Sequence, residues 1–140
     1  ELRSVWINFM EKIVQKDEIL YRAIKRSRPD SLDENGNPTS ALFKQEDGVS
    51  VDRDGERTEM EIIGALKQNL GKRFKGAVKV GADVCIDNGM AVIPAPTENI
   101  YHAEIYENMN KEELSSLHAL ILADNAQIVT IEKVIPWTNL

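Results

Sequence analysis

Cysteine and histidine are scarce in this chain of 140 residues. Cys85 is the only cysteine, so no disulfide can form within the chain, as is usual for proteins of a reducing compartment. It falls in an apolar alternating segment with no activating base expected beside it, which predicts a buried core thiol rather than a nucleophile. The two histidines, His102 and His118, are too few for a histidine-rich zinc site. We therefore expect no such metal site and no cofactor.

Long apolar runs are also missing. No segment approaches the ~18 consecutive apolar residues of a membrane-spanning helix, and the N-terminus has no signal-peptide core. The chain also lacks a P-loop, a dinucleotide-binding glycine pattern and a nucleophile elbow, which excludes the chemistries that depend on them. We therefore expect a cytoplasmic protein that makes no membrane contact.

The chain is acidic overall, but its charge is unevenly distributed. The net charge of −6 argues against general nucleic-acid binding, which requires a basic surface. Residues 1–28 nevertheless contain seven basic and four acidic residues, a net +3 that leaves −9 for the remainder. Lys25, Arg26 and Arg28 form a basic cluster there, which offers a local contact to a phosphate group or an acidic partner.

The size and composition are those of one folded domain over residues 1–140, with 42% hydrophobic and 29% charged residues. Leu2, Val5, Trp6 and Phe9 recur at helical spacing, which predicts a helix over residues 1–16 that packs on the domain or forms an oligomer. A strand over 19–24, an exposed loop over 25–38, an apolar piece over 41–43 and a strand over 49–51 are expected next.

Capping and turn signals organise the rest of the chain. Thr58 and Glu61 predict a capping box, and Gly71 predicts the end of the helix that it starts. Alternation over residues 78–86, followed by Asn88-Gly89, predicts a hairpin with a type I′ turn and a return strand over 90–93. Prolines bound that strand, which suggests a sheet edge near Pro94.

The last third is expected to hold a strand over 100–106, a helix and a strand over 128–134. Asn110 and Glu113 predict the start of the helix. Its expected buried stripe consists of Leu114, Leu117, Leu120 and Ile121, with His118 beside it as a surface or packing residue. The whole order favours an α+β fold, in which about three helices pack on one face of a mainly antiparallel sheet.

The polar residues of the first half are the main site candidates. Arg22 lies on a half-buried strand, so it needs either a structural ion pair or an anionic ligand such as a phosphate or carboxylate. Ser40, Lys44, Ser50 and Asp52 lie on short apolar pieces between turns, as in many small ligand sites. The alternative is that the hydroxyls bond to the loop backbone and that Asp52-Arg53 is an exposed turn.

A second group of candidates lies on the strand over residues 100–106. Strand alternation places His102, Glu104 and Tyr106 on one face. His102 and Glu104 are therefore weak candidates, with Ser50, for acid–base chemistry or ligand binding. The alternative for His102 is an ordinary strand residue that needs only one hydrogen bond.

Four short motifs resemble a pattern that is shared by a group of short bacterial proteins of uncharacterised function. They are Leu20-Tyr21-Arg22, Ser40-Ala41-Leu42-Phe43-Lys44, Ser50-Val51-Asp52, and Pro94 to Pro96 with His102-Ala103. This resemblance covers residues 20–126 and implies no particular reaction.

The chain is also similar to small ADP-ribosyltransferases, which combine an early strand arginine, a later strand serine and a late glutamate. Arg22, Ser50 and either Glu104 or Glu107 occur in that order. The resemblance implies that the arginine binds dinucleotide phosphates and that the glutamate orients the attacking nucleophile. Ser50 is followed by Val51-Asp52 rather than by the threonine-serine pair of that family.

Three functions are therefore open. The first is a binding or accessory module in which Arg22, Lys44 and neighbouring residues contact an anionic small molecule or a protein partner. The second is a small enzyme that acts on a nucleotide. The third is a structural component that forms a homo-oligomer through residues 1–16 or through the sheet edge near Pro94.

Overall fold

A six-stranded sheet organises the chain in the computed structural model, which describes residues 13–133. The strand order is β4-β5-β2-β1-β3-β6, and all neighbouring strands are antiparallel. The strands are β1 (Ile19–Lys25), β2 (Val49–Arg53), β3 (Phe74–Gly81), β4 (Ala91–Pro94), β5 (His102–Tyr106) and β6 (Gln127–Ile131). The helices are α2 (Glu59–Leu70), α3 (Ala82–Asp87) and α4 (Ser116–Asn125), with 3-10 turns η1 (Pro29–Ser31), η2 (Ser40–Phe43) and η3 (Gly71–Arg73). The predicted α+β class with one antiparallel sheet and three helices is confirmed.

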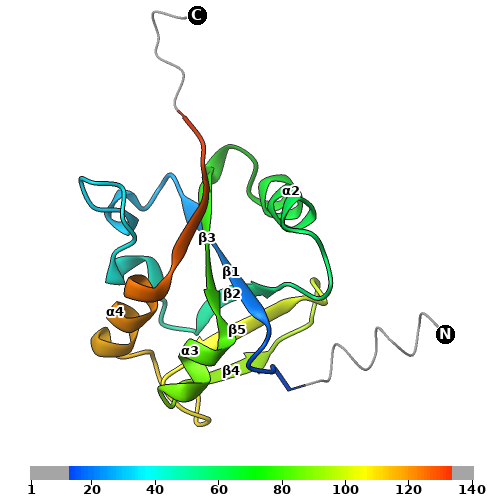
Figure 1. Ribbon diagram of the computed structural model, residues 1–140, viewed down its shortest axis with the longest axis vertical. Helices are drawn as coiled ribbons and strands as arrows, with labels where there is room; N and C mark the ends of the chain where they lie inside the picture. Colours follow the sequence, from blue (N-terminus) through cyan, green and yellow to red (C-terminus); the bar gives the residue numbers. More distant parts are fainter. Residues whose placement is uncertain (1–12, 134–140) are drawn as a thin grey trace, which may run out of the picture.

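The helices are shared between the two faces of the sheet rather than gathered on one. Strand alternation turns Tyr21 and Arg22 of β1 to opposite faces. The Tyr21 hydroxyl donates to Glu59 at the start of α2, whereas the Arg22 side chain donates to Leu42 of η2. Figure 1 shows the sheet nearly edge-on, with α2 on one side and α4 on the other.

The main core lies between the sheet and the layer formed by η2, α3 and α4. Its fully buried members include Leu20, Phe43, Ile105 and Leu122, which come from β1, η2, β5 and α4. Cys85 of α3 belongs to the same cluster, and burial raises the pKa of its thiol to about 12. The prediction of a core thiol is therefore confirmed.

The α2 helix begins and ends as its sequence predicts. The Thr58 hydroxyl accepts from the Glu61 amide, and the Glu61 carboxylate accepts from the Thr58 amide, so the capping box is complete. Gly71 has a φ of 57°, a left-handed angle that glycine adopts without steric cost, and its amide donates to the Lys67 carbonyl. Ile62 is the fully buried residue of this helix.

The predicted hairpin at Asn88-Gly89 is wrong. Residues 78–81 belong to β3, but residues 82–87 form α3, and the next strand, β4, pairs with β5 instead of returning along β3. Asn88 has a φ of −102°, whereas a type I′ turn requires positive φ at both central residues. Gly89 and Met90 donate to the carbonyls of Ile86 and Cys85, so the dipeptide ends α3 as a Schellman motif.

The start predicted for the last helix is also wrong. The α4 helix is capped by Ser115, whose hydroxyl accepts from the His118 amide, and not by Asn110. Lys111, which lies between the two positions, has a left-handed φ of 59° that breaks any earlier helix. The later start changes the buried face, because Ala119 and Leu122 are fully buried whereas Leu117 and Leu120 are exposed.

The other expectations for the chain have mixed outcomes. The strands over 19–24 and 49–51 are present as β1 and β2, and β4, which ends at Pro94, is an edge strand of the sheet. The loop over 25–38 is mostly exposed, although it contains η1 and the buried Ser31. The helix expected over 1–16 lies mainly outside the described residues, and residues 13–16 are not helical. No helix within residues 13–133 is long and apolar enough to cross a membrane.

Candidate functional site

Arg22 is an almost fully buried cation held by neutral groups. Only 7% of the residue is exposed. Its Nε donates to the Leu42 carbonyl at 2.9 Å, and its Nη1 donates to the Ser50 carbonyl at 2.9 Å and to Gln45 Oε1 at 3.1 Å. None of the carboxylates within residues 13–133 forms an ion pair with it, so the structural ion pair considered for Arg22 is not found there. Burial lowers the pKa of Arg22 to about 10, and the nearby charge of Arg28 contributes to that shift.

The charges nearest to Arg22 are also positive. The Nη2 of Arg28 donates to the Ala41 carbonyl at 2.9 Å and to the Lys44 carbonyl at 3.1 Å. The pKa of Lys25 is lowered, first by burial and then by the charges of Arg22, Arg73 and Arg28. We refer to Arg22, Lys25 and Arg28 as the cationic cluster. Its two arginines bind carbonyl groups at the C-terminal end of η2, which attract cations.

Gln45 links this cluster to β2 and was not identified from the sequence. Its Oε1 accepts from Arg22 Nη1 and, at 3.2 Å, from the Ser50 amide. Its side-chain amide also lies 3.4 Å from the Ser50 hydroxyl. Gln45 therefore holds the guanidinium in place between β1 and β2. The backbone carbonyls that bind Arg22 and Arg28 carry no residue-specific signal, so sequence alone could not have indicated these contacts.

Ser40 and Lys44 lie at the two ends of η2. Ser40 is half-buried at the first position of this turn, and Lys44 is exposed just after its last residue. The Lys44 carbonyl, rather than its ammonium group, contacts the cationic cluster. The predicted candidates Arg22, Ser40 and Lys44 are thus brought together around η2, with Ser50 joined to them through its backbone.

A separate row of polar side chains lies on the opposite face of the sheet. The register pairs Ser50 with Glu104 and Asp52 with His102, so these four side chains share one face of β2 and β5. Tyr21 pairs with Asp52, so Arg22, the next residue of β1, points to the other face. Arg22 and Glu104 therefore do not converge, and this arrangement does not favour a dinucleotide site built from Arg22, Ser50 and Glu104.

Glu104 is the centre of that row. One carboxylate oxygen lies 3.1 Å from the Tyr106 hydroxyl, and the other lies 3.9 Å from His102 Nε2. The pKa of Tyr106 is raised, first by burial and then by its hydrogen bond to Glu104. The same hydroxyl lies 3.1 Å from the Asp47 carbonyl. These contacts order the strand face, and His102 and Glu104 remain half-exposed.

Asp52 and Arg53 are buried strand residues, so the alternative of an exposed turn at these positions is wrong. Asp52 lies 3.3 Å from Arg57 Nη2 and accepts from Asn99 at 3.1 Å. Arg53 donates from Nε and Nη2 to the two carboxylate oxygens of Glu18, at 2.7 and 2.9 Å. Asp52 and Arg53 thus join β2 to neighbouring segments and have a structural role.

Glu107, the alternative late glutamate, caps α4. Its Oε1 accepts from the Ser115 amide at 3.0 Å and lies 2.7 Å from His118 Nδ1. The pKa of Glu107 is lowered, first by the Ser115 amide and also by His118. His118 is thus a partly buried partner at the helix start, as the packing interpretation expects.

The polar candidates form two groups, one around Arg22 and one around Glu104, which Gln45 links through Ser50. Within residues 13–133, no group of three His, Cys, Asp or Glu side chains is placed to hold a metal ion. Comparison of the chain with known protein families, curated proteins and solved structures gives no match in any of the three. A functional assignment therefore has to come from the geometry of the cationic cluster and its surroundings.

Proposed function

We propose that this protein is a binding module for a small anion, which the cationic cluster of Arg22, Lys25 and Arg28 recognises. The observation that carries the proposal is the nearly complete burial of Arg22 without a carboxylate partner among residues 13–133. Buried charges in proteins are normally paired, because removing an ion from water costs several kcal/mol. A bound anion would supply the missing negative charge.

The hydrogen-bonding capacity of the cluster supports this function. An arginine carries five N–H donors, and the bonds of Arg22 occupy Nε and Nη1. Its Nη2 makes no hydrogen bond to residues 13–133. No buried side-chain nitrogen of the described residues lacks a partner, so this Nη2 is accessible to solvent. In its contacts with residues 13–133, Arg28 uses only its Nη2, so its Nε and Nη1 are available to the same ligand.

A phosphate or carboxylate group fits these donors. Guanidinium groups bind such anions through paired, charge-assisted hydrogen bonds, which are shorter and stronger than neutral ones. Lys25 adds a third positive charge, and an anion near it would oppose the part of the lowering of its pKa that neighbouring positive charges cause. The carbonyls of η2 hold both arginines before the ligand arrives, so little side-chain ordering is left for the binding step.

Thermal unfolding with sodium phosphate, against sodium chloride at equal ionic strength, tests this function. A ligand at one hundred times its Kd adds about 2.7 kcal/mol to the free energy of unfolding. We expect phosphate to raise the melting temperature and to shift the amide resonances of Leu42, Gln45 and Ser50. Arg28→Gln and Lys25→Gln should reduce both effects, whereas the exposed control Lys111→Gln should retain them. Equal responses to phosphate and chloride would refute the proposal, as would full binding in both cluster variants.

A further inference from the structure

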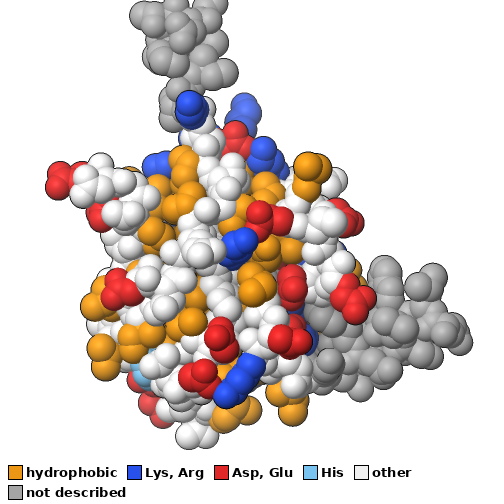
Figure 2. Space-filling model, in the orientation of Figure 1, with side chains coloured by type: hydrophobic (Ala, Val, Ile, Leu, Met, Phe, Trp, Pro, Cys, Tyr) orange, Lys and Arg blue, Asp and Glu red, His pale blue; other side chains and the backbone are white. Residues whose placement is uncertain are grey.

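The fold brings two basic segments together at one end of the molecule. Residues 22–28 and residues 67–75 each contain four basic residues and no acidic residue. Lys25 of β1 pairs with Phe74 of β3, and the Arg26 amide donates to the Arg73 carbonyl at 2.8 Å. Figure 2 shows Lys and Arg side chains gathered near the end of β6. Positive charge is thus concentrated at this end of a protein whose net charge is −6.

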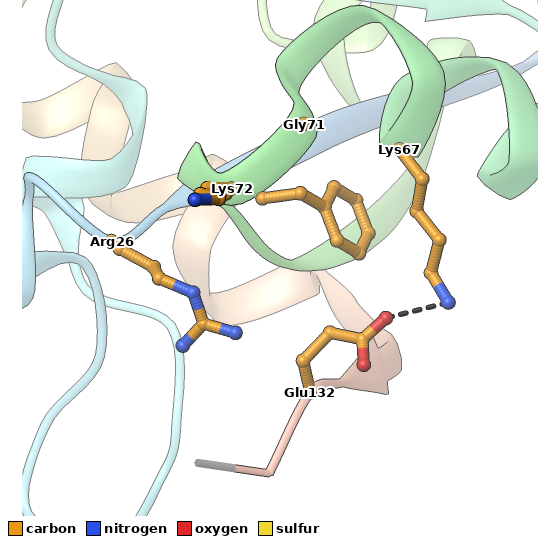
Figure 3. A pocket seen from close by; sticks show the side chains of 6 residues that line it. Arg26, Lys67, Gly71, Lys72 and Glu132 are labelled. Carbon is orange, nitrogen blue, oxygen red and sulfur yellow. Dashed lines mark ion pairs between the residues drawn. The ribbon is translucent and has the colours of Figure 1, made fainter. Parts of the chain in front are cut away.

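An open pocket of about 310 Å³ lies between these segments. Its lining consists of Arg26, Lys67, Gly71, Lys72, Phe74 and Glu132. In Figure 3 the Glu132 carboxylate lies between the side chains of Arg26 and Lys67. The volume is at the lower end of the range for small-molecule sites, ~300–1,000 Å³, and is larger than a single inorganic anion requires.

The three cations of the pocket differ in their contacts with the rest of the protein. Lys67 forms an ion pair with Glu132 at 2.5 Å, and its ammonium lies 5.8 Å from the centre of the Phe74 ring. Arg26 and Lys72 are exposed, and their side chains make no hydrogen bond or ion pair with any other residue of 13–133. Two cations are therefore available to a ligand, and a third is held by a carboxylate that the ligand can replace.

Room for an organic group is present beside these charges. A methyl group added at Gly71 would meet no atom within 4 Å, so the space next to this residue is empty. Phe74, which is buried under the pocket, supplies an apolar wall. Three cations and one carboxylate leave a net charge of about +2, which matches a phosphate monoester in its dianionic form.

We propose that this pocket is a second binding site, which takes a small phosphorylated organic molecule. Arg26 and Lys72 contact the phosphate, and the organic part lies over Gly71 and Phe74. Glu132 acts as an internal competitor, because the phosphate displaces it from Lys67. The site uses none of the three residues of the cationic cluster, so it does not depend on the function proposed above.

Isothermal titration with phenyl phosphate, compared with inorganic phosphate and phenol, tests this site. We expect phenyl phosphate to bind more tightly than either, with shifts of the amide resonances of Gly71, Phe74 and Glu132. Loss of one charge-assisted hydrogen bond corresponds to about a tenfold loss of affinity or more, and this is expected for Arg26→Gln and Lys72→Gln. Glu132→Gln should bind more tightly than the wild type, because it removes the competing charge.

Matched variants separate this site from the cationic cluster. Arg28→Gln and the control Lys111→Gln should leave the affinity for phenyl phosphate at this pocket unchanged. Arg26, Lys72 and Lys111 are exposed and Arg28 and Glu132 are partly exposed, so we expect these variants to fold. The second site is excluded if, in Arg28→Gln, where the cationic cluster is weakened, phenyl phosphate shifts the Gly71 and Phe74 resonances at no lower concentration than inorganic phosphate does. It is also excluded if Arg26→Gln and Lys72→Gln bind as the wild type does, or if Glu132→Gln binds more weakly.

Discussion

Replacement of Gly48 by alanine is expected to destabilise the protein through two separate effects. Gly48 has a φ of 95°, a region that L side chains rarely adopt. An alanine Cβ at this position would also lie 2.6 Å from Cζ of the Tyr106 ring and 2.8 Å from its hydroxyl oxygen. The ring would have to move, and its contacts with the Asp47 carbonyl and the Glu104 carboxylate would be lost.

The size of the effect follows from these two contributions. A non-glycine residue in the left-handed region costs about 1–2 kcal/mol. The Tyr106 hydroxyl has one hydrogen to share between the Asp47 carbonyl and the Glu104 carboxylate, so its loss adds about 0.5–1.5 kcal/mol. We therefore expect Gly48→Ala to lower the free energy of unfolding by about 1.5–3.5 kcal/mol, a large part of the ~5–15 kcal/mol of a typical domain.

Gly36→Ala is the matched control for the backbone contribution. Gly36 has a similar φ of 79°, but an added Cβ would meet no atom within 4 Å. Urea unfolding should therefore show a loss of only about 1–2 kcal/mol for this variant. The excess loss in Gly48→Ala should shrink in a Tyr106→Leu background, where the ring is absent. If Gly48→Ala and Gly36→Ala lose the same stability, the close contact with Tyr106 does not constrain this turn, and the reasoning fails.

Three further predictions concern single groups of the fold. Burial raises the pKa of Cys85 to about 12. Ellman's reagent at pH 8 should therefore label this thiol only after the protein is unfolded in urea. Labelling of the folded protein at the rate of free cysteine would contradict the burial of Cys85. Thr58→Ala should lower the free energy of unfolding by about 1 kcal/mol, because the α2 helix loses its cap. Thr58→Ser keeps the hydroxyl and should change this free energy little. Equal losses in the two variants would show that the hydroxyl does not stabilise the helix. The Ser115 amide and His118 lower the pKa of Glu107 below its usual 4.5. The ionised Glu107 carboxylate therefore stabilises the folded state at neutral pH. This stabilisation is lost as the pH falls through the lowered pKa. Urea unfolding should therefore show Glu107→Gln as less stable than the wild type at pH 7 and the two converging in acid, and a difference independent of pH would count against this role.

Local signals predicted the parts of the fold that local contacts determine. The α2 helix has its capping residues within one turn of each other, and β1 is a mostly apolar segment that is buried on both faces as a central strand. The Asn88-Gly89 dipeptide shows where such signals fail. Glycine with positive φ serves both a type I′ turn and the end of a helix, so the dipeptide alone fits either structure. The pairing of β4 with β5 decides between them, and that contact is remote in sequence.

The buried face of residues 82–86 was ambiguous for a related reason. Ala82, Val84 and Ile86 alternate as strand residues do, but Ala82 and Cys85 also have the spacing of one helical face. In the structure this second pair is fully buried, and Val84 and Ile86 are only partly buried. A short apolar run fits the spacing of both a strand and a helix. The packing of the whole core, rather than the local sequence, therefore decides which of the two forms.

The sequence predicted the side chains of the candidate site but not the backbone groups that they contact. Arg22 stood out because a cation on a half-buried strand requires acceptors, and the structure buries it as expected. Its acceptors are mainly backbone carbonyls, which every residue possesses, and so neither η2 nor Gln45 could be identified as its partner from the sequence.

The concentration of cations at one end allows an acidic chain to attract anions locally in physiological salt. Charges separated by more than the Debye length, ~8 Å at physiological ionic strength, are largely screened from each other. The acidic residues elsewhere on the chain therefore reduce the attraction at the cationic cluster and the pocket only weakly in physiological salt. In dilute buffer the screening length grows, and the net charge of −6 opposes the approach of any anion. Salt should consequently weaken anion binding less than it does for a protein with a basic surface, because it screens the long-range repulsion together with the local attraction.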